Sequence, residues 1–331
     1  MTIGVSVVGA GFWAREMHLP ALARLPGVKI TSVVATTEES ARRAAEPYGA
    51  RALTDIAQAA ADPGTDVLDI VAPPDVHLLA VESAASHGKH AICIKPLARD
   101  LDEADRMLAA VRQAGTRLFY AENVPFIPAL HEAKKVVDAG GIGDVFRVKA
   151  CEGIGEPHSD WFYDPARSGG GAILDMAVHS LEFCRFFAGA PITGVYAEAG
   201  TFVHNGRTGV EDTAVLTLRF ANGVIGQCED SWSLVGAMDS RFEVYGTRGR
   251  ILVDNLHRQP LQVVTGTKGW SYPMPIEGLV ADGHLAMLGH FLDCLRTGAP
   301  SLSDGQVGRD VLAVVDAAYR SVTSGQKETV R

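Results

Sequence analysis

Asp175 and His179 stand four positions apart in the segment SGGGAILDMAVHSLE, which covers residues 168–182. On a helix this spacing places both side chains on one face, one turn apart. A carboxylate beside an imidazole is suited to proton transfer, because the unperturbed pKa of histidine, about 6.5, lies near neutral pH. With Glu182 at the next matching position, the same spacing is also the solvent-facing stripe of any amphipathic helix. The rest of the chain has to decide between these two interpretations.

Lys95 is a third side chain suited to chemistry, and it directly follows the apolar run His90–Ile94. The carboxyl end of a parallel strand is where open α/β sheets bind ligands. There a lysine can donate a hydrogen bond to a reacting oxygen and stabilise its alkoxide character. Taken alone, it is equally a surface lysine at a strand end.

The elements that must position Lys95 belong to an alternating N-terminal third. Apolar strand-like runs occur at Ile3–Val8, Ile30–Ala35, Val67–Ala72, His90–Ile94 and Arg117–Ala121, and amphipathic helical segments at Glu38–Tyr48, Val76–His87 and Leu101–Ala114. Near-continuous apolar strands separated by helices predict a parallel sheet covered on both faces. We therefore predict a doubly wound α/β (Rossmann) domain over residues 1–122.

The first turn of this domain reads GAGFWA, in which Gly9, Gly11 and Ala14 fill the G-x-G-x-x-G/A fingerprint. Its glycines permit a tight turn and let a pyrophosphate approach the N-terminus of the following helix. Because the motif follows a strand and opens a helix, we predict a dinucleotide site formed by residues 9–14, including Phe12 and Trp13. The alternative is a glycine turn that only packs the helix against the strand.

The end of the second strand bears on which dinucleotide binds. An acidic residue there would bind the ribose 2′-hydroxyl of NAD, but the strand runs into Thr36 and Thr37, with no carboxylate before Glu38. Two hydroxyls with Arg42 nearby suit a 2′-phosphate, so NADP is slightly favoured over NAD. The alternative is that Arg42 is solvated on a helix face.

The chain changes character after residue 122. A helix is expected at Ile127–Ala139, strands at Val145–Cys151, Ala214–Phe220, Val224–Asp230, Phe242–Tyr245 and Ile251–Asp254, and helices at His284–Arg296 and Gly305–Ser324. Asn222-Gly223 is a strong hairpin signal between two of these strands. Residues 123–331 are thus predicted to form an α+β domain with a mainly antiparallel, open-faced sheet. An open face needs a cover, so a homodimer or homotetramer is expected.

Bulk composition excludes several classes of protein. The 331 residues are 47% hydrophobic and 21% charged, with a net charge of −9. This negative charge argues against binding to nucleic acid or to an anionic membrane. The five scattered cysteines lack C-x-x-C spacing, so neither a disulfide framework nor a zinc site is expected. No basic leader and no run of membrane-spanning length is present. A cytoplasmic protein acting on small molecules is the expectation.

Together, GAGFWA, VAPPDVH (71–77), GKHAICIKPLA (88–98) and GGGAILDMAVHSLE (169–182) resemble the Gfo/Idh/MocA oxidoreductases nearly end to end. The resemblance implies hydride transfer between NAD(P) and a secondary alcohol or ketone of a sugar, cyclitol or sugar derivative. It implies that Lys95, Asp175 and His179 are catalytic and touch the substrate. It also implies a cis peptide at Pro96. The implied cofactor contacts include Ala72, Pro73, Pro74, His77, Lys95 and Asn123.

The loop of residues 152–167 supplies further substrate contacts in this interpretation. We expect Trp161 or Tyr163 to stack on a sugar ring, and His158 or Arg167 to bind hydroxyls or a carboxylate. The alternative is that most of its charges are solvated. No spacing of metal ligands is present, so no metal is expected. The glycines at 169–171 are either a flexible lead-in or a place where a ligand approaches the backbone.

Two departures from the family pattern stand out. Ile94 occupies the position before Lys95 where the family usually has glutamate, and Phe126 stands where many relatives carry a basic residue. The competing hypotheses are a non-catalytic dinucleotide-binding regulator and a lyase or epimerase that recycles its nicotinamide internally. The presence of Lys95, Asp175 and His179 together favours an oxidoreductase. Glu182 is expected to remain in solvent.

Overall fold

The computed structural model describes residues 2–256, 259–266, 268–272 and 283–331. The chain divides into two compact units, one of residues 1–122 with 284–309 and one of residues 123–283 with 310–331. The sequence placed the whole of 123–331 in the second domain. The structure assigns the segment 284–309 to the first unit instead.

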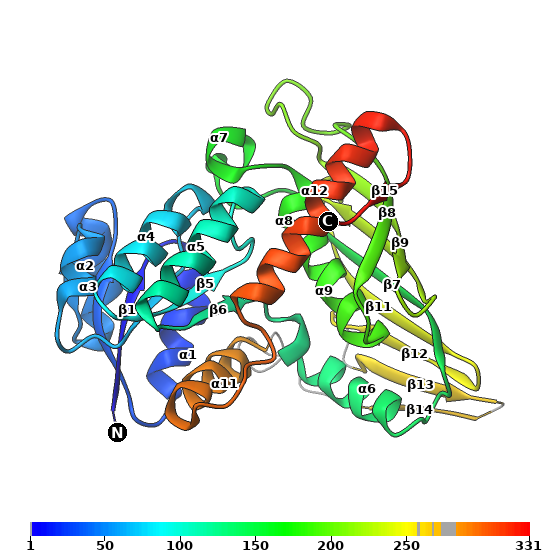
Figure 1. Ribbon diagram of the computed structural model, residues 1–331, viewed down its shortest axis with the longest axis horizontal. Coiled ribbons are helices and arrows are strands. Elements are labelled where there is room, and N and C mark those ends of the chain that lie inside the picture. Colours follow the sequence, from blue (N-terminus) through cyan, green and yellow to red (C-terminus); the bar gives the residue numbers. More distant parts are fainter. Residues whose placement is uncertain (1, 257–258, 267, 273–282) are drawn as a thin grey trace. The chain divides into compact units, whose positions relative to one another are not determined.

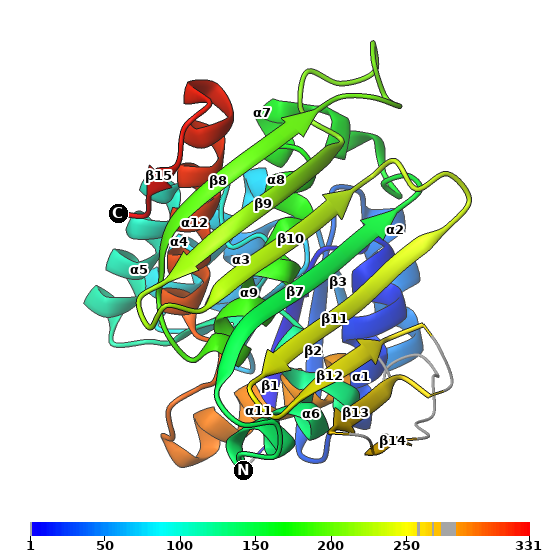
Figure 2. The ribbon, with the colours of Figure 1, turned by 90° about the vertical axis from the view of Figure 1, so that its right-hand side faces the viewer.

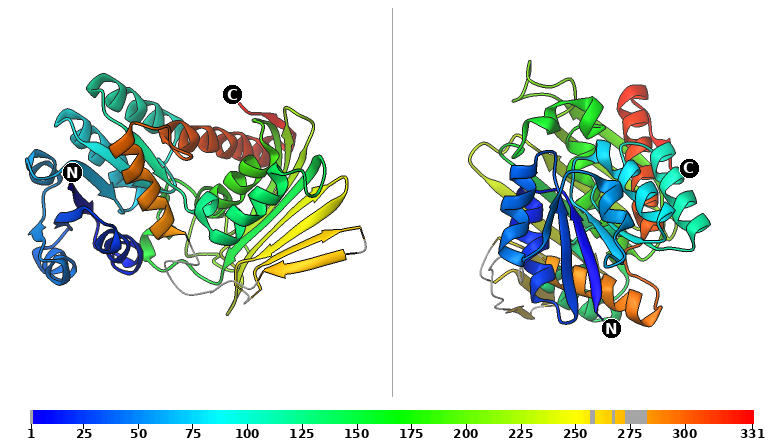
Figure 3. Two further views of the ribbon diagram at one scale, coloured as in Figure 1. Left: turned by 90° about the horizontal axis from the view of Figure 1, so that it is seen from below. Right: turned by 90° about the vertical axis from the view of Figure 1, so that its left-hand side faces the viewer.

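The first unit is built on a six-stranded parallel sheet with strand order β3-β2-β1-β4-β5-β6 (Figure 1). Its strands are β1 (Ile3–Val8), β2 (Val28–Val34), β3 (Arg51–Leu53), β4 (Val67–Ile70), β5 (His90–Ile94) and β6 (Leu118–Ala121). Its helices include α1 (Leu19–Arg24), α2 (Glu38–Ala45), α3 (Ile56–Ala61), α4 (Pro74–Ser86) and α5 (Leu101–Ala114). Helices flank the sheet on both faces (Figure 3, right). The doubly wound prediction is confirmed, and β1 and β4 adjoin where the strand order reverses.

The elements that the sequence missed here are short. Strand β3 has three residues and helix α3 has six, too few for a periodic signal to emerge. Helix α3 is nevertheless capped in the usual way, since the Asp55 carboxylate accepts a hydrogen bond from the Ala57 N–H at 2.8 Å. Short edge elements of this kind are decided by packing more than by pattern.

Side-chain contacts explain why the segment 284–309 joins the first unit. Helix α11 (His284–Thr297) stacks Phe291 on Phe119 of β6, with ring centroids 5.0 Å apart. Arg117 donates hydrogen bonds to the carbonyl oxygens of Cys294 at 2.7 Å and Ala299 at 2.8 Å. These contacts span about 180 positions of sequence, which no local pattern reveals.

The second unit is built on a nine-stranded sheet with strand order β14-β13-β12-β11-β7-β10-β9-β8-β15. Its strands are β7 (Val145–Ile154), β8 (Ile192–Gly200), β9 (Thr213–Phe220), β10 (Ile225–Ser231), β11 (Met238–Gly246), β12 (Gly249–Asp254), β13 (Leu261–Thr265), β14 (Lys268–Tyr272) and β15 (Glu328–Thr329). All neighbours pair antiparallel except β7 and β10, which are parallel. The prediction of a mainly antiparallel sheet is therefore confirmed.

Helices of the second unit cover one face of this sheet. They are α6 (Pro128–Asp138), α7 (Pro165–Ser168), α8 (Ala172–Asp175), α9 (Ala177–Ala188) and the second part of α12 (Gly305–Ser324). Figure 2 looks onto the opposite face, with α6 and α9 behind the strands. Strand β9 shows the consequence, because its residues alternate between buried and exposed from Ala214 to Phe220. The open face that the sequence predicted is present.

Other expectations concern cysteines, metals and membranes. All five cysteines are free thiols, and four of them are buried. Within the described residues, no group of three or more His, Cys, Asp or Glu side chains is placed to hold a metal ion. Among the helices of that same part of the chain, none is long and apolar enough to cross a membrane.

Candidate functional site

The nucleotide loop after β1 uses its two fingerprint glycines differently. Gly9 has φ +125°, and a Cβ built on it would lie 2.0 Å from the Val71 carbonyl oxygen. A Cβ on Gly11 would meet no atom within 4 Å. Gly9 is therefore required by the fold itself, whereas the backbone at Gly11 borders open space. That open space is what a pyrophosphate approaching the backbone requires.

This loop lies beside the segment that follows β4. The Gly9 N–H donates to the Val34 carbonyl oxygen and the Val71 N–H to the Val8 carbonyl oxygen, each at 2.8 Å. The loop before Pro74 thus starts next to the nucleotide loop at the reversal of strand order, where open α/β sheets bind ligands. Ala72 and Pro73 are half-buried and Pro74 is buried as the first residue of α4.

The helix after the loop runs from Phe12 to Arg24 and contains a π-helical turn at Ala14–His18. Phe12 is 45% exposed, and Trp13 stacks on His284 with ring centroids 5.7 Å apart. His18 connects the π-helical turn to β4, because its Nδ1 lies 2.9 Å from the Asp69 carboxylate and both side chains are fully buried. No local sequence pattern reveals this pair, because its partners are 51 positions apart.

The end of β2 carries hydroxyl side chains that are open to solvent. Thr36 and Thr37 are exposed, and the Thr37 hydroxyl caps α2 by accepting a hydrogen bond from the Ser40 N–H at 3.2 Å. Arg42 is exposed on α2, with Glu38 in the first turn. Hydroxyls are thus available at the strand end, where no carboxylate stands.

His77 and Lys95 occupy neighbouring loops of the first unit. His77 is fully buried, with Nε2 2.8 Å from the Ala72 carbonyl oxygen and Nδ1 3.1 Å from the Leu97 carbonyl oxygen. Burial lowers the pKa of this imidazole, against the opposing effect of the carbonyl contacts. His77 therefore holds the loop after β4 against the loop after β5. That second loop contains the half-buried Lys95 and the cis Lys95-Pro96 bond, as the resemblance implied.

The two departures from the family pattern both lie in apolar surroundings. Ile94 ends β5 and is 8% exposed. Phe126 is buried in the short 3₁₀ turn Val124–Phe126, which is preceded by the half-buried Asn123. Each replaces a charged group of the family pattern by a buried hydrophobic side chain.

In the second unit, Asp175 and His179 do not share one continuous helix. Helix α8 ends at Asp175, Met176 forms a turn, and α9 begins at Ala177. The His179 N–H donates to the Met176 carbonyl oxygen, three positions earlier, at 3.1 Å. This is the pattern of a 3₁₀ turn, which is wound more tightly than an α-helix. Asp175 is thus the buried end of one helix, while His179 lies half-buried in the first turn of the next.

A contact between Asp175 and Trp232 is not apparent from the sequence. Trp232 follows β10, is fully buried, and its indole Nε1–H donates to Asp175 Oδ2 at 2.8 Å. Phe162, Ala172, Met176 and Trp232 form one buried apolar cluster. The Asp175 carboxylate therefore lies beside this apolar cluster and accepts a hydrogen bond from the indole of Trp232.

Glu182 contradicts the expectation that it would be solvated. Its side chain is fully buried and pairs with Arg185, which donates from Nε at 2.8 Å and from Nη2 at 2.6 Å. The two residues are three positions apart on α9, so the helix itself brings them together. The polar stripe of this helix thus faces protein.

A second buried carboxyl lies behind α9. Ser180 and Asp230 of β10 are hydrogen bonded at 2.6 Å, and Asp230 is 1% exposed. Burial raises the pKa of Asp230 well above its usual range. Its hydrogen bond with Ser180 ties α9, the helix that carries His179, to the sheet.

The aromatic loop of residues 152–167 packs around Trp232. Trp161 is half-buried and stacks on Phe162 at 3.7 Å between ring centroids. Tyr163 is buried, with the Arg207 guanidinium 3.9 Å from its ring centroid. Of the predicted stacking residues, Trp161 is thus the more accessible. His158 and Arg167 are both exposed.

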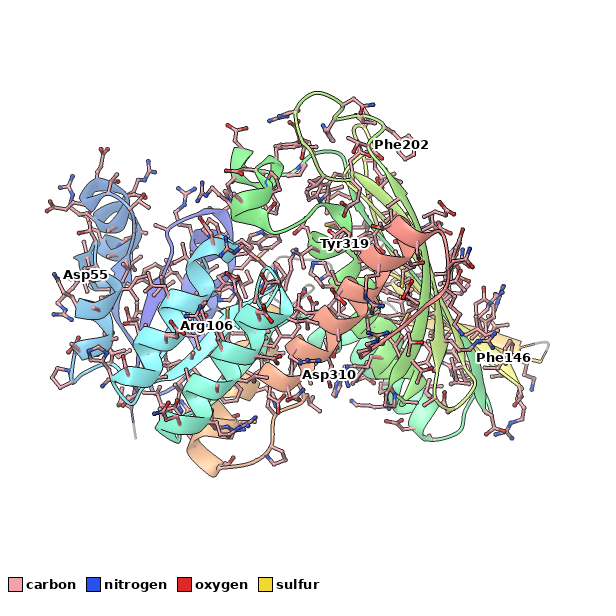
Figure 4. All side chains as sticks on the ribbon, turned by 45° about the horizontal axis from the view of Figure 1, so that its top comes forward. Asp55, Arg106, Phe146, Phe202, Asp310 and Tyr319 are labelled. Carbon is pink, nitrogen blue, oxygen red and sulfur yellow. The ribbon has the colours of Figure 1, made fainter. Side chains whose placement is uncertain are left out.

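The glycine run before α8 is fixed by packing within the second unit. A Cβ on Gly171 would lie 2.0 Å from the Glu211 carbonyl oxygen, and one on Gly170 would lie 2.3 Å from the Tyr319 hydroxyl. Glu211 also accepts hydrogen bonds from the Ile173 N–H and the Tyr319 hydroxyl, both at 2.9 Å (Tyr319 is labelled in Figure 4). Protein groups therefore approach the backbone closely at Gly170 and Gly171.

Comparison with known proteins agrees with this geometry. Residues 3–122 match the family described as "Oxidoreductase family, NAD-binding Rossmann fold", and residues 130–252 match "GFO/IDH/MocA C-terminal domain". The chain is 29% identical to myo-inositol 2-dehydrogenase of Thermotoga maritima, over 96% of each chain. It is 30% identical to 1,5-anhydro-D-fructose reductase of Ensifer adhaerens, over 97% of this chain and 96% of that one.

A solved structure extends the likeness to the whole chain. GenD2 from gentamicin A biosynthesis, determined in complex with NAD, superposes with a TM-score of 0.91 at 28% identity, covering 100% of this chain and 97% of that one. Both domains of the family pattern are therefore present in the expected order. The chain belongs to the Gfo/Idh/MocA family of oxidoreductases, and its first unit is an NAD-binding Rossmann domain.

Proposed function

We propose that this protein is an NAD(P)-dependent dehydrogenase, or in the reverse direction a reductase, acting on a secondary alcohol of a sugar, cyclitol or related polyol. The first unit would bind the dinucleotide, and the second would bind substrate and make the oligomer contacts. The observation that carries the proposal is the nucleotide loop, open at Gly11 and placed where the strand order reverses. The inositol dehydrogenase and anhydrofructose reductase among the relatives support the substrate class.

Oxidation of a secondary alcohol removes a hydride from carbon and a proton from the hydroxyl. When bound, the nicotinamide accepts the hydride. In our proposal His179 takes the hydroxyl proton, since an imidazole exchanges protons near neutral pH. Asp175 favours the imidazolium or binds a substrate hydroxyl, and Lys95 donates a hydrogen bond to the reacting oxygen. In the reductive direction His179 returns the proton.

Single substitutions test these three roles. We expect His179→Ala to lower kcat by at least about 100-fold, the range of general acid–base catalysis, while the Kd of the dinucleotide stays within a few-fold. If His179 and Lys95 assist one step, a Lys95→Met/His179→Ala double variant is little worse than the poorer single variant. Normal turnover by His179→Ala would refute the acid–base assignment.

The cofactor preference is the finer part of the proposal. We propose that NADP binds at least as well as NAD, because Thr36 and Thr37 offer hydroxyls where an NAD-specific site would carry a carboxylate. Titration of each dinucleotide against tryptophan fluorescence measures the two Kd values. Thr36→Asp should then shift the ratio toward NAD, because a carboxylate repels the 2′-phosphate. Clearly tighter binding of NAD by the unmodified protein would refute the NADP preference.

Substrate contacts are proposed from the aromatic loop. The half-buried Trp161, already stacked on Phe162, would offer its indole to a sugar or cyclitol ring, and the exposed His158 and Arg167 would bind hydroxyls. The test is a panel of inositols, aldoses, anhydrosugars, glycosides and uronates, followed by NAD(P)H absorbance with each cofactor. Conversion of a substrate without net NAD(P)H would instead indicate a lyase or epimerase. Dinucleotide binding with no turnover of any panel member would indicate a regulator.

The open face of the second sheet is proposed to make a homodimer or homotetramer. Tyr196 of β8, Val215 of β9 and Ile225 of β10 lie exposed on strands of that sheet. Apolar side chains on the uncovered face of an antiparallel sheet favour association with a second copy. Sedimentation at micromolar concentration tests this, and a pure monomer would contradict it.

A further inference from the structure

We propose that Trp232 is a positioning residue for the chemistry of this protein: its indole N–H fixes the orientation of the Asp175 carboxylate and favours its ionised form. The inference rests on the proposed function, which gives Asp175 its role. It adds a residue that neither the fingerprint nor the Asp175–His179 motif identifies. Asp175, Trp232 and the residues that hold them all lie in the second unit.

The hydrogen bond between the two side chains is buried and well formed. Indole Nε1 lies 2.8 Å from Asp175 Oδ2, Trp232 is fully buried, and Asp175 is 7% exposed. An indole is a donor only, so this N–H has to find an acceptor when buried. A hydrogen bond to an ionised acceptor is stronger than one between neutral groups. The carboxylate is therefore held by a group that supports its charge.

The indole ring has little freedom to turn away. Phe162 meets it edge to face at 6.1 Å and 82°, and Tyr163 does so at 6.0 Å and 69°. Ala172 and Met176, which flank Asp175 along the chain, belong to the same buried cluster. Residues close to Asp175 in the chain therefore help to hold the indole ring that contacts the Asp175 carboxylate.

The backbone of Trp232 is held on both sides of the residue. Its N–H donates to the Asp212 carbonyl oxygen at 2.7 Å, and His204 Nε2 lies 3.1 Å from its carbonyl oxygen. The flanking hydroxyls of Ser231 and Ser233 are 2.6 Å apart, and Thr213 contacts that of Ser233 at 2.7 Å. Because these hydrogen bonds fix the backbone on both sides of Trp232, its side chain has little freedom to change direction.

Asp212 anchors the whole arrangement. Its buried carboxylate accepts hydrogen bonds from three successive backbone N–H groups, those of Phe202 at 3.0 Å, Val203 at 2.8 Å and His204 at 2.9 Å. These bonds fix the loop that brings His204 to the Trp232 carbonyl oxygen. A continuous set of contacts therefore runs from Asp212 through Trp232 to Asp175.

Other ionisable groups surround this set and bear on any pH profile. They are His179 on α9, Glu182 and Arg185 further along it, Glu211 and Tyr319 at the start of α8, Asp230 with Ser180, and Tyr163, Glu156, Asp160, Arg207 and His204 around the indole. Trp232→Phe leaves each of these ionisable side chains in the protein. A change in the profile of that variant then reports the loss of the indole N–H.

A spectroscopic experiment on the full chain with saturating NAD tests the bond itself. The protein has four tryptophans, so ¹⁵N-tryptophan labelling gives at most four indole N–H signals, which single Trp→Phe variants assign. We expect the Trp232 signal to be the most downfield and the slowest to exchange with solvent. Asp175→Asn should shift this signal more than the other three. A Trp232 signal at the position of a free indole would overturn the proposal, even if the Trp232→Phe variant does not fold.

Kinetics then test the consequence, using the panel substrate with the highest kcat/KM. We expect Trp232→Phe to lower kcat by about 10- to 100-fold, the loss of one hydrogen bond to a charged group, with the KM for dinucleotide unchanged within about twofold. The acid limb of the kcat/KM profile should move to higher pH, because a carboxylate that loses a donor is protonated more readily. Trp270→Phe, which alters a half-exposed indole on β14, is the matched control and should match the unmodified enzyme.

The outcomes separate the inference from the proposed function. If Asp175→Asn abolishes turnover while Trp232→Phe keeps the unmodified kcat and pH profile, the role of Trp232 is refuted and the proposed function stands. If Asp175→Asn keeps normal turnover, the proposed role of Asp175 fails, and with it the significance of the bond. A lower kcat without a shift of the acid limb would mean that Trp232 acts only through packing, which also refutes the proposal.

Discussion

The two glycines of the nucleotide loop offer a direct test of how the first unit separates folding from cofactor binding. Alanine at position 9 would have to adopt φ +125° and place its Cβ 2.0 Å from the Val71 carbonyl oxygen. Strain of this kind costs about 1–3 kcal/mol, and overpacking against fixed backbone costs about 1–3 kcal/mol more. We therefore expect Gly9→Ala to lower the free energy of unfolding by about 2–6 kcal/mol. That is a large part of the stability of a typical domain, about 5–15 kcal/mol.

Alanine at position 11 should have the opposite pattern. Its Cβ would meet no protein atom within 4 Å, and Gly11 is not among the glycines with positive φ. Folding should then be unchanged or more stable by up to about 1 kcal/mol. The added methyl would instead crowd the pyrophosphate, so we expect the Kd of NAD to rise by about 5- to 150-fold, from an overpacking cost of about 1–3 kcal/mol.

Thermal unfolding with and without NAD measures both effects. A fall of 1 kcal/mol shifts Tm by about 2–4 °C in a domain of about 150–250 residues, so the first unit of Gly9→Ala should unfold about 4–24 °C lower without ligand. NAD at 100 times its Kd stabilises the unmodified protein by about 2.7 kcal/mol, and Gly11→Ala at the same concentration should lose most of that gain. An unchanged Tm for Gly9→Ala, or an unchanged NAD affinity for Gly11→Ala, would refute the reasoning.

Three further predictions concern the second unit. Arg185→Met removes the guanidinium that pairs with the buried Glu182 carboxylate and should lower the free energy of unfolding by about 3 kcal/mol, seen as a lower urea midpoint. Because burial raises the pKa of Asp230, its contribution to stability is present below about pH 4 and is lost as pH rises toward the raised pKa. Asp230→Asn should therefore exceed the unmodified protein in stability at pH 8, with the difference narrowing toward pH 4 in urea unfolding. Gly171→Ala, whose Cβ would lie 2.0 Å from the Glu211 carbonyl oxygen, should cost about 1–3 kcal/mol and lower Tm, and an unchanged Tm would count against the packing argument.

Local sequence patterns were sufficient for most of the fold. The runs Ile3–Val8 and His90–Ile94 were predicted as strands with the bounds that the structure has, as was the helix Leu101–Ala114. The Asn222-Gly223 signal also lies between β9 and β10, as expected for a hairpin. These features follow from the spacing of apolar residues and from the residue preferences of turns. Both depend on only a few neighbouring positions and can therefore be recognised in the sequence.

The chemistry of the second unit depended on contacts that no local pattern contains. Asp175 and Trp232 are 57 positions apart and meet only because a pinned turn after β10 directs the indole toward α8. Glu182 looked solvated because polar residues at helical spacing usually face water, yet the structure buries it against Arg185. Helical periodicity gives the face on which a side chain lies, but only the neighbouring elements decide whether that face meets solvent.

The sequence by itself determined that this chain is a Rossmann domain followed by an α+β domain, with Lys95, Asp175 and His179 as the groups suited to chemistry. Tertiary structure decided how those groups are held: the turn at Met176 that separates Asp175 from His179, the indole donor on the carboxylate, and the return of residues 284–309 to the first unit. The physical reason is the range of the forces involved. Backbone propensity is set by near neighbours, whereas burial and hydrogen-bond pairing are set by whichever distant segments pack together.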